Sequence, residues 1–181
     1  MNFTKINVDD IVYTQKNSGS YSSIATTIRN KSIQFTTPPL RLPFGIQKYN
    51  TSYTAALQFM NYNKKNFEIM SFLCFIQSIE DKHRDYIETD LQKDRDLLRT
   101  QLQQKNPKYD PLLQSKIYMS GGQIKTVSLD KDKRPISLFD IKKGSVVKCE
   151  LHMNPLYNFK DSYVSKFVIY KITVISEPTQ S

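Results

Sequence analysis

The chain has 181 residues, of which 39% are hydrophobic and 12% aromatic, and its formal net charge is +9. This composition excludes an intrinsically disordered chain, and the length suffices for one domain with a sizeable core. No apolar run approaches the length that spans a membrane, and residues 1–10 (MNFTKINVDD) lack the apolar stretch of a signal peptide.

The first part of the chain predicts a flexible arm followed by a β-hairpin. Residues 1–20 are polar and end in KNSGS, which predicts the arm. Residues 21–29 (YSSIATTIR) and 32–37 (SIQFTT) are rich in β-branched residues and predict two strands joined by a tight turn. This turn would place Arg29 and Lys31 at a basic hairpin tip.

An apolar segment follows this hairpin. Pro38-Pro39 ends the second strand, because proline cannot donate a hydrogen bond to a sheet. In the next residues, 40–46 (LRLPFGI), every second position is apolar. We expect this segment to be pinned across one end of a sheet or barrel, with Gly45 in a turn that only glycine adopts readily. Residues 53–60 (YTAALQFM) alternate again and predict a third strand.

The middle of the chain predicts a helical insert. Over residues 63–105 the apolar period moves from two toward 3.6, which predicts one or two helices with a bend near 80–82. The expected apolar face is wide and consists of Phe67, Met70, Phe72, Cys74, Phe75, Ile76 and Ile79. Because that face needs a sheet to cover it, we expect the insert to cap the sheet and not to form a separate domain.

Strands resume after the insert and complete one domain. Residues 114–119 and 123–129 flank Gly121-Gly122 and predict a hairpin. The remaining predicted parts are a strand over 146–153, a loop over 154–161, a long strand over 162–175 and a short tail over 176–181. The order predicts a mainly β domain over 21–175, a five-stranded OB-fold barrel with an extra hairpin and the helical insert between strands 3 and 4. Periodicity alone also allows other small α+β barrels.

These segments resemble the single-stranded DNA-binding proteins of nucleocytoplasmic large DNA viruses, which are related to the podophage single-stranded DNA-binding protein. The resemblance begins in TTPPLRLPFGI and continues, in order, through YTAALQF, FLCFIQSIEDKHRDYI, KIYM…KTVSL, KKGSVVKCEL and VSKFVIYKITVI. It implies an OB-fold and sequence-tolerant binding of single-stranded DNA during viral replication, recombination or repair. The podophage-type protein ends in an acidic tail, whereas residues 176–181 carry only Glu177, so recruitment of partners by the tail is not expected here.

The excess of positive over negative charge lies in the β-rich parts of the chain. Residues 1–62 carry +4, residues 63–105 carry 0 and residues 106–181 carry +5. A positive surface on a sheet is the footprint expected of a polyanion binder, although a generally basic proteome would give the same excess.

Catalytic and metal-binding groups are sparse. His83, in a charged helical stretch, and His152, on a strand, are isolated, which predicts ordinary surface or edge residues. The carboxylates of residues 80–96 alternate with Lys and Arg as on a solvated helix face. With two His, two Cys and no paired spacing, we expect no enzyme activity, metal or cofactor. Cys74 and Cys149 lie in apolar patterns and predict reduced core cysteines in a reducing compartment.

Basic and aromatic residues are the better candidates for a site. Single strands are held by cations that contact phosphates and by rings that stack on bases. In an OB barrel these groups come from the middle strands and from the loops that join strands 1–2 and 4–5. The predicted nucleic-acid-binding residues are Arg29, Lys31, Arg41, Lys48, Tyr49, Lys116, Tyr118, Tyr157, Phe159, Lys160 and Lys166. Instead of contacting DNA, Arg41 could have a structural role and hold the segment around Gly45. The aromatic residues could likewise pack in the core.

The sequence therefore predicts a non-enzymatic binder of single-stranded DNA, as a monomer or homodimer, without a membrane partner. Viral replication proteins are candidate partners. The resemblance implies a viral factory in the host cytoplasm, or the host nucleus, with packaging in the virion left open. The alternative is a structural virion component whose basic surface contacts the genome or a capsid protein.

Overall fold

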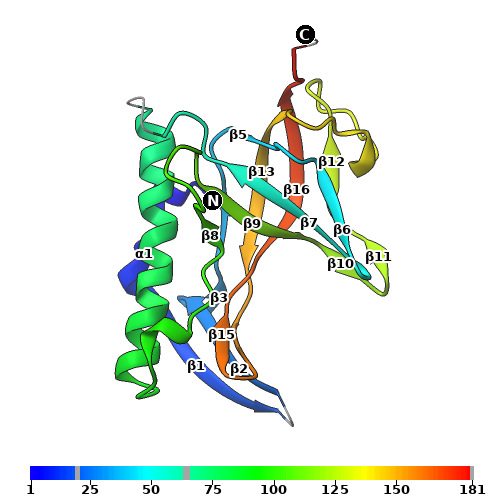
Figure 1. Ribbon diagram of the computed structural model, residues 1–181. Helices are drawn as coiled ribbons and strands as arrows, with labels where there is room; N and C mark the ends of the chain where they lie inside the picture. The colour runs from blue at the N-terminus through cyan, green and yellow to red at the C-terminus, as the bar shows by residue number, and fades with distance from the viewer. Residues whose placement is uncertain (19–20, 63–65, 180–181) are drawn as a thin grey trace.

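The computed structural model describes residues 1–18, 21–62 and 66–179, and its centre is a closed β-barrel with one long helix against it (Figure 1). The barrel strands, in order around the barrel, are β4 (Gln34–Thr36) with β5 (Leu40–Arg41), β7 (Ser52–Gln58), β9 (Leu112–Ile117), β16 (Phe167–Ser176) and β13 (Val146–Met153). Neighbours are antiparallel except β9 and β16, whose parallel pairing closes the barrel. The predicted five-stranded OB-fold barrel is confirmed.

A second sheet lies below the barrel in Figure 1 and includes the predicted hairpin. Its order is β1 (Val12–Ser18), β2 (Tyr21–Ile28), β14 (Leu156–Phe159) and β15 (Ser162–Val164), with β3 (Lys31–Ser32) paired to β2. The tight β2–β3 turn is present, with Arg29 and Asn30 at positive φ. The strand predicted at 21–29 is thus outside the barrel, so the helix connects the second and third barrel strands.

The N-terminal residues are folded against the barrel, which corrects the prediction of a loose arm over 1–20. Phe3 and Ile11 are buried in the main core, and two short 3₁₀ helices (Phe3–Lys5 and Val8–Asp10) lead into β1. Asn2 and Asn7 cap these turns by accepting hydrogen bonds from backbone N–H groups. Because this segment is mostly polar, its sequence did not indicate that Phe3 and Ile11 would be buried. Gly19 and Ser20 lie outside the described residues.

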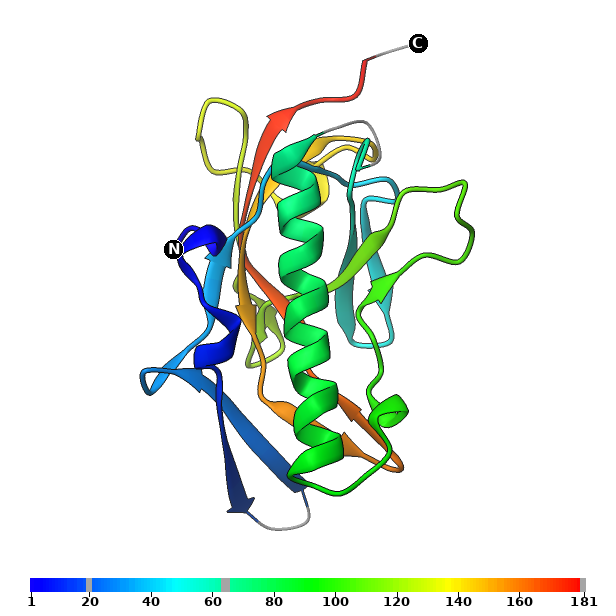
Figure 2. The same cartoon turned by 90° about the vertical axis from the view of Figure 1, so that its left-hand side faces the viewer.

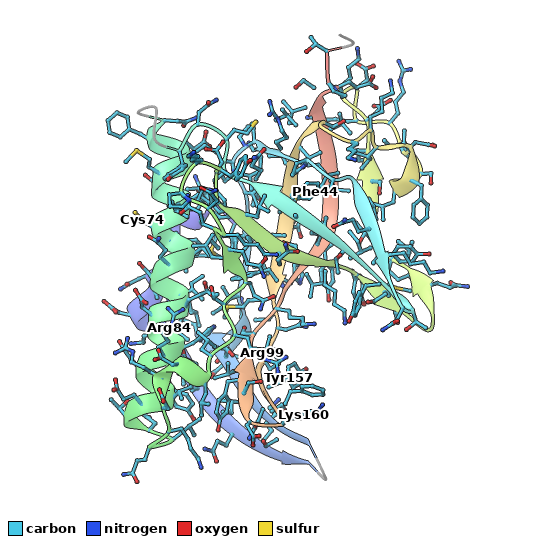
Figure 3. All side chains as sticks on the ribbon, viewed as in Figure 1. Phe44, Cys74, Arg84, Arg99, Tyr157 and Lys160 are labelled. Carbon is cyan, nitrogen blue, oxygen red and sulfur yellow. The ribbon has the colours of Figure 1, made fainter. Side chains whose placement is uncertain are left out.

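The insert contains a single α-helix, α1 (Phe67–Thr89), which runs without a bend through residues 80–82. Its buried stripe includes Ile69, Phe72, Ile76, Ile79 and His83. The predicted face is confirmed at four positions, which are buried: Phe72, Phe75, Ile76 and Ile79. It was wrong at Phe67, Met70 and Cys74: Phe67 is 78% exposed, and Cys74 points away from the barrel on the outer side of the helix (Figure 3). The first turns are apolar nearly all round, so periodicity could not select the stripe that packs.

The helix α1 runs along one side of the barrel (Figure 2), and its buried face packs on aromatic side chains from the barrel and from the N-terminus. Phe72 lies with ring centroids 5.1 Å from Phe3, 5.5 Å from Phe59 and 6.0 Å from Phe35. The helix thereby covers the core at one side of the barrel, as the sequence predicts. In the described part of the chain, no helix is both long and apolar enough to cross a membrane. Residues 63–65 of the predicted insert are not among the described residues.

The segment 40–46 is pinned at the barrel end, as predicted. Leu40 and Leu42 are fully buried, and the Leu42 N–H donates to the Ser145 carbonyl over 2.8 Å. Gly45 has φ +68°, the left-handed conformation expected of it. Phe44 is exposed, contrary to the alternating pattern.

Short hairpins extend from the barrel. β6 (Ile46–Tyr49) pairs with β7, and β10 (Met119–Ser120) pairs with β11 (Gln123–Ile124) across Gly121-Gly122, as predicted. The remaining strands are β8 (Leu102–Gln103), which pairs with β9, and β12 (Val127–Leu129), which pairs with β16.

The region predicted as a loop over 154–161 and one strand over 162–175 is organised differently. β14 and β15 form a hairpin with its turn at Lys160, and β16 begins only at Phe167. Ser165 is buried between them and donates to the Asn154 carbonyl over 2.8 Å, which closes the base of the hairpin. The β14–β15 hairpin is therefore an ordered hairpin that extends from the connection between the fourth and fifth barrel strands.

Candidate nucleic-acid interface

A groove of about 690 Å³ runs between the barrel and the β14–β15 hairpin. Its floor is formed by Thr54 of β7 and by Gln114 and Lys116 of β9, which face outward from the barrel. One wall is the β14–β15 hairpin, with Tyr157 and Phe159. The groove is also lined by residues 98–103, which follow α1 and which we call the strap.

Three cations converge on this groove. Lys116 from β9, Lys166 from the start of β16 and Arg99 from the strap all line it. Partial burial, with the nearby positive charges of Lys116 and Arg99, lowers the pKa of Lys166. Among the described residues, none of the three forms an ion pair with a carboxylate. Like charges gathered without a counter-charge favour binding of an anion.

The aromatic side chains of β14 stand on the groove wall (Figure 3). Tyr157 is 39% exposed and Phe159 is 50% exposed, and their two-residue spacing puts both on one face of the strand. The predicted alternative of burial in the core is therefore excluded for these two rings. Arg99 and Lys160 lie 5.9 Å and 5.6 Å from the centroid of the Phe159 ring, which keeps positive charge beside it.

Arg99 is the groove residue that the sequence did not indicate. It lies in a part of the chain whose net charge is zero, and its neighbours alternate in sign. In the structure Arg99 lies apart from these charged neighbours. Arg95 pairs with Asp85 and Glu88. The backbone N–H of Arg99 instead donates to the Tyr163 carbonyl of β15 over 2.8 Å. This contact brings the strap to the hairpin, and only the fold reveals it.

Tyr118 directly follows β9 and belongs to a stack of three rings. The Tyr118 and Tyr170 ring centroids are 4.0 Å apart, and those of Tyr170 and His152 are 3.6 Å apart. The three ring planes are nearly parallel. Tyr170 therefore lies in the middle of the stack, and Tyr118 and His152 are its two ends. His152 was predicted to be an unremarkable strand residue, but it ends this stack on the barrel surface.

The predicted site residues fall into separate places. Lys116, Tyr157, Phe159 and Lys166 line the groove, with Lys160 beside Phe159. Lys48 and Tyr49 lie at the tip of the β6–β7 hairpin, which joins the first and second barrel strands, and Arg41 is exposed on β5.

Arg29 and Lys31 were assigned to the loop between barrel strands 1 and 2, and that assignment is wrong. The β2–β3 turn that carries them lies on the opposite side of α1 from the β14–β15 turn (Figure 2). They line a different hollow together with Lys5. The error came from counting the 21–29 strand as part of the barrel.

Fold and groove together define an OB-fold barrel protein with a cationic, aromatic-walled surface groove. No protein-family model matches the chain, and no curated protein matches its sequence. Solved structures do match in fold. The single-stranded DNA-binding protein gp2.5 of bacteriophage T7 superposes with a TM-score of 0.58 at 10% identity, over 83% of this chain and 90% of its own. The single-stranded DNA-binding protein of bacteriophage Enc34, in complex with single-stranded DNA, gives 0.53 at 10% identity over 94% and 97%.

Proposed function

We propose that the protein binds single-stranded DNA through this groove, with little sequence specificity, during replication, recombination or repair of viral DNA. The observation that carries the proposal is the meeting of Arg99, Lys116 and Lys166 with the exposed rings of Tyr157 and Phe159 in one groove. Cations along a groove follow the phosphates, and exposed rings stack on unpaired bases of any identity.

Two further observations support a nucleic acid as the ligand of this groove. The groove lies where OB-folds bind oligonucleotides, on the outer face of middle strands and beside the loop between strands 4 and 5. One of the matching structures is itself a complex with single-stranded DNA. The choice of DNA over RNA rests on the sequence resemblance described above and on the phage proteins that share the fold. The origin in a large DNA virus rests on the sequence resemblance alone.

The proposal also explains why duplex DNA should bind weakly. Bases in a duplex are already stacked on one another, so the rings of Tyr157 and Phe159 gain nothing from them. A structural component that only neutralises genome charge would have no reason to expose rings beside its cations. Preference for single strands therefore separates the two functions.

The test is a fluorescence-anisotropy titration of one labelled oligonucleotide as single-stranded DNA, as duplex and as RNA, at fixed salt. We expect tightest binding to single-stranded DNA. Two charge reversals on the same insert give a matched comparison: Arg99→Glu should weaken binding strongly, and the exposed Lys93→Glu should leave it intact. Equal affinity for single strand and duplex, or equal effects of both reversals, would contradict the proposed function.

A further inference from the structure

Glu80 of α1 is a buried carboxylate that no cation pairs with at ion-pair distance among the described residues. It is only 5% exposed, and burial raises its pKa. Burying a charged group is costly unless hydrogen bonds satisfy it, so its partners define its role.

Both carboxylate oxygens of Glu80 are engaged by the strap. The Thr100 hydroxyl donates to Oε1 over 2.5 Å, and the Gln101 backbone N–H donates to Oε2 over 2.9 Å. Hydrogen bonds to an ionised group are stronger than those between neutral groups. Thr100 and Gln101 directly follow Arg99, and all three residues line the groove.

The other attachments of the strap lie mainly at its two ends, and Leu98 at its start is buried in a core cluster that includes Ile87 of α1. Its start is held to β15 by the Arg99 N–H bond to Tyr163, and its end pairs with β9 through Leu102 and Leu113. Between these ends, the Gln101 carbonyl accepts a hydrogen bond from the Gln114 N–H of β9 over 2.8 Å. Glu80 supplies the contacts to α1 at the point where the strap crosses from the hairpin to the barrel.

We propose that Glu80 is a positioning residue for the groove, whose carboxylate holds the strap where Arg99 meets the bound strand. The inference rests on the proposed function. It gives α1 a second role besides covering the core, because the helix sets the place of one groove wall without touching the nucleic acid.

The first experiment compares substitutions at Glu80 for affinity and for salt dependence on a single-stranded oligonucleotide. Glu80→Met removes both acceptors, and we expect about a fivefold to tenfold loss of affinity and a log–log salt slope smaller by about 0.7, the value of one phosphate contact. Glu80→Gln should restore most of the affinity, since its amide accepts from one donor and donates to the Thr100 hydroxyl. The exposed neighbour variant Asp81→Asn should behave as wild type.

The second experiment is a double-mutant cycle with Arg99. If Glu80 acts through the strap, Glu80→Met should cause no further loss in an Arg99→Ala background. An equal loss in both backgrounds would show that Glu80 acts only through general stability and would overturn the inference. Circular dichroism at the assay temperature establishes that each variant is folded. If Glu80→Met does not fold, Thr100→Val breaks the contact from the strap side and enters the same cycle.

The outcomes separate this inference from the proposed function. Absence of single-strand binding by the wild-type protein would contradict the function itself. Tight wild-type binding with unchanged affinity in folded Glu80→Met would contradict only the positioning role.

Discussion

The hydroxyl of Tyr13 lies 2.7 Å from Nδ1 of His83, across 70 positions of sequence, and fastens β1 to α1. The Tyr13 ring also stacks on Tyr86 with centroids 4.1 Å apart. His83 was predicted to lie at the surface of a charged helix, but it is buried, and its Nε2 has no hydrogen-bond partner among the described residues. One buried histidine therefore ties the second sheet to the helix.

This histidine predicts a loss of stability in acid. Burial, with the charge of Arg84, lowers the pKa of His83 from 6.5 to about 3. Below pH 6.5 the unfolded chain binds a proton that the folded protein does not accept until about pH 3. The free energy of unfolding should thus fall by up to about 1.4 kcal/mol per pH unit within this window and be unaffected by His83 above it.

Urea denaturation of wild type and His83→Gln at pH values from 7 to 4 measures this contribution. The difference between the two proteins removes the effects of the other titrating groups. We expect the free energy of unfolding of the wild type to fall relative to that of His83→Gln as the pH is lowered. If the free energies of unfolding of the two proteins instead ran parallel over the whole pH range, His83 would bind a proton as readily in the folded protein as in the unfolded chain.

A second prediction compares two phenylalanines of α1. Phe75 packs against Phe3 and Phe35, with ring centroids 5.5 Å and 5.0 Å away, whereas Phe67 is 78% exposed. Phe75→Ala should lower the free energy of unfolding by roughly 3–5 kcal/mol, because it leaves a cavity. Phe67→Ala should change it by less than about 0.5 kcal/mol. Similar losses in thermal or urea denaturation would mean that Phe67 is covered in solution.

The third prediction concerns salt. Arg99, Lys116, Lys160 and Lys166 lie in or beside the groove, so log affinity should fall linearly with log salt with a slope of about −3, at about 0.7 per phosphate. Lys116→Gln should reduce the slope by about 0.7. Arg29→Gln, on the other side of α1, should not change it. A flat salt response in the wild type would remove the electrostatic part of the proposal.

The barrel could be read from the sequence because its signals are local. Alternation marks β7, β9 and β13, and the Gly121-Gly122 pair marks a hairpin without reference to the rest of the chain. The second sheet could not be placed in this way. Its central pairing joins Leu156 of β14 to Ile24 of β2, and no local pattern encodes a contact over that separation.

The same limit applied to the candidate site. Lys116 and Lys166 stand on or beside strands whose outward faces follow from alternation, so they could be predicted to face solvent. Arg99 could not, since its position depends on where the strap crosses the barrel after α1. Arg29 was misplaced because alternation identifies a strand but not the sheet to which it belongs.

The last prediction separates stacking from charge. Tyr157 and Phe159 expose their rings on the groove wall, and stacking on an aromatic ring is worth roughly 1–3 kcal/mol per base. Changing both to Ala should weaken single-strand binding by about one to two orders of magnitude and barely change weak duplex binding. The salt slope should stay the same because no cation is lost.

Lys160→Ala is the matched control at the same hairpin, since it removes charge beside Phe159 and leaves both rings in place. It should weaken single-strand and duplex binding alike and make the salt slope smaller by up to about 0.7. Anisotropy titrations at fixed salt, with circular dichroism on each variant, measure both effects. Wild-type affinity in the folded Tyr157→Ala, Phe159→Ala variant would mean that bases stack elsewhere. Tyr118, at one end of the ring stack, and the exposed Tyr49 at the β6–β7 tip would then be the rings to test next.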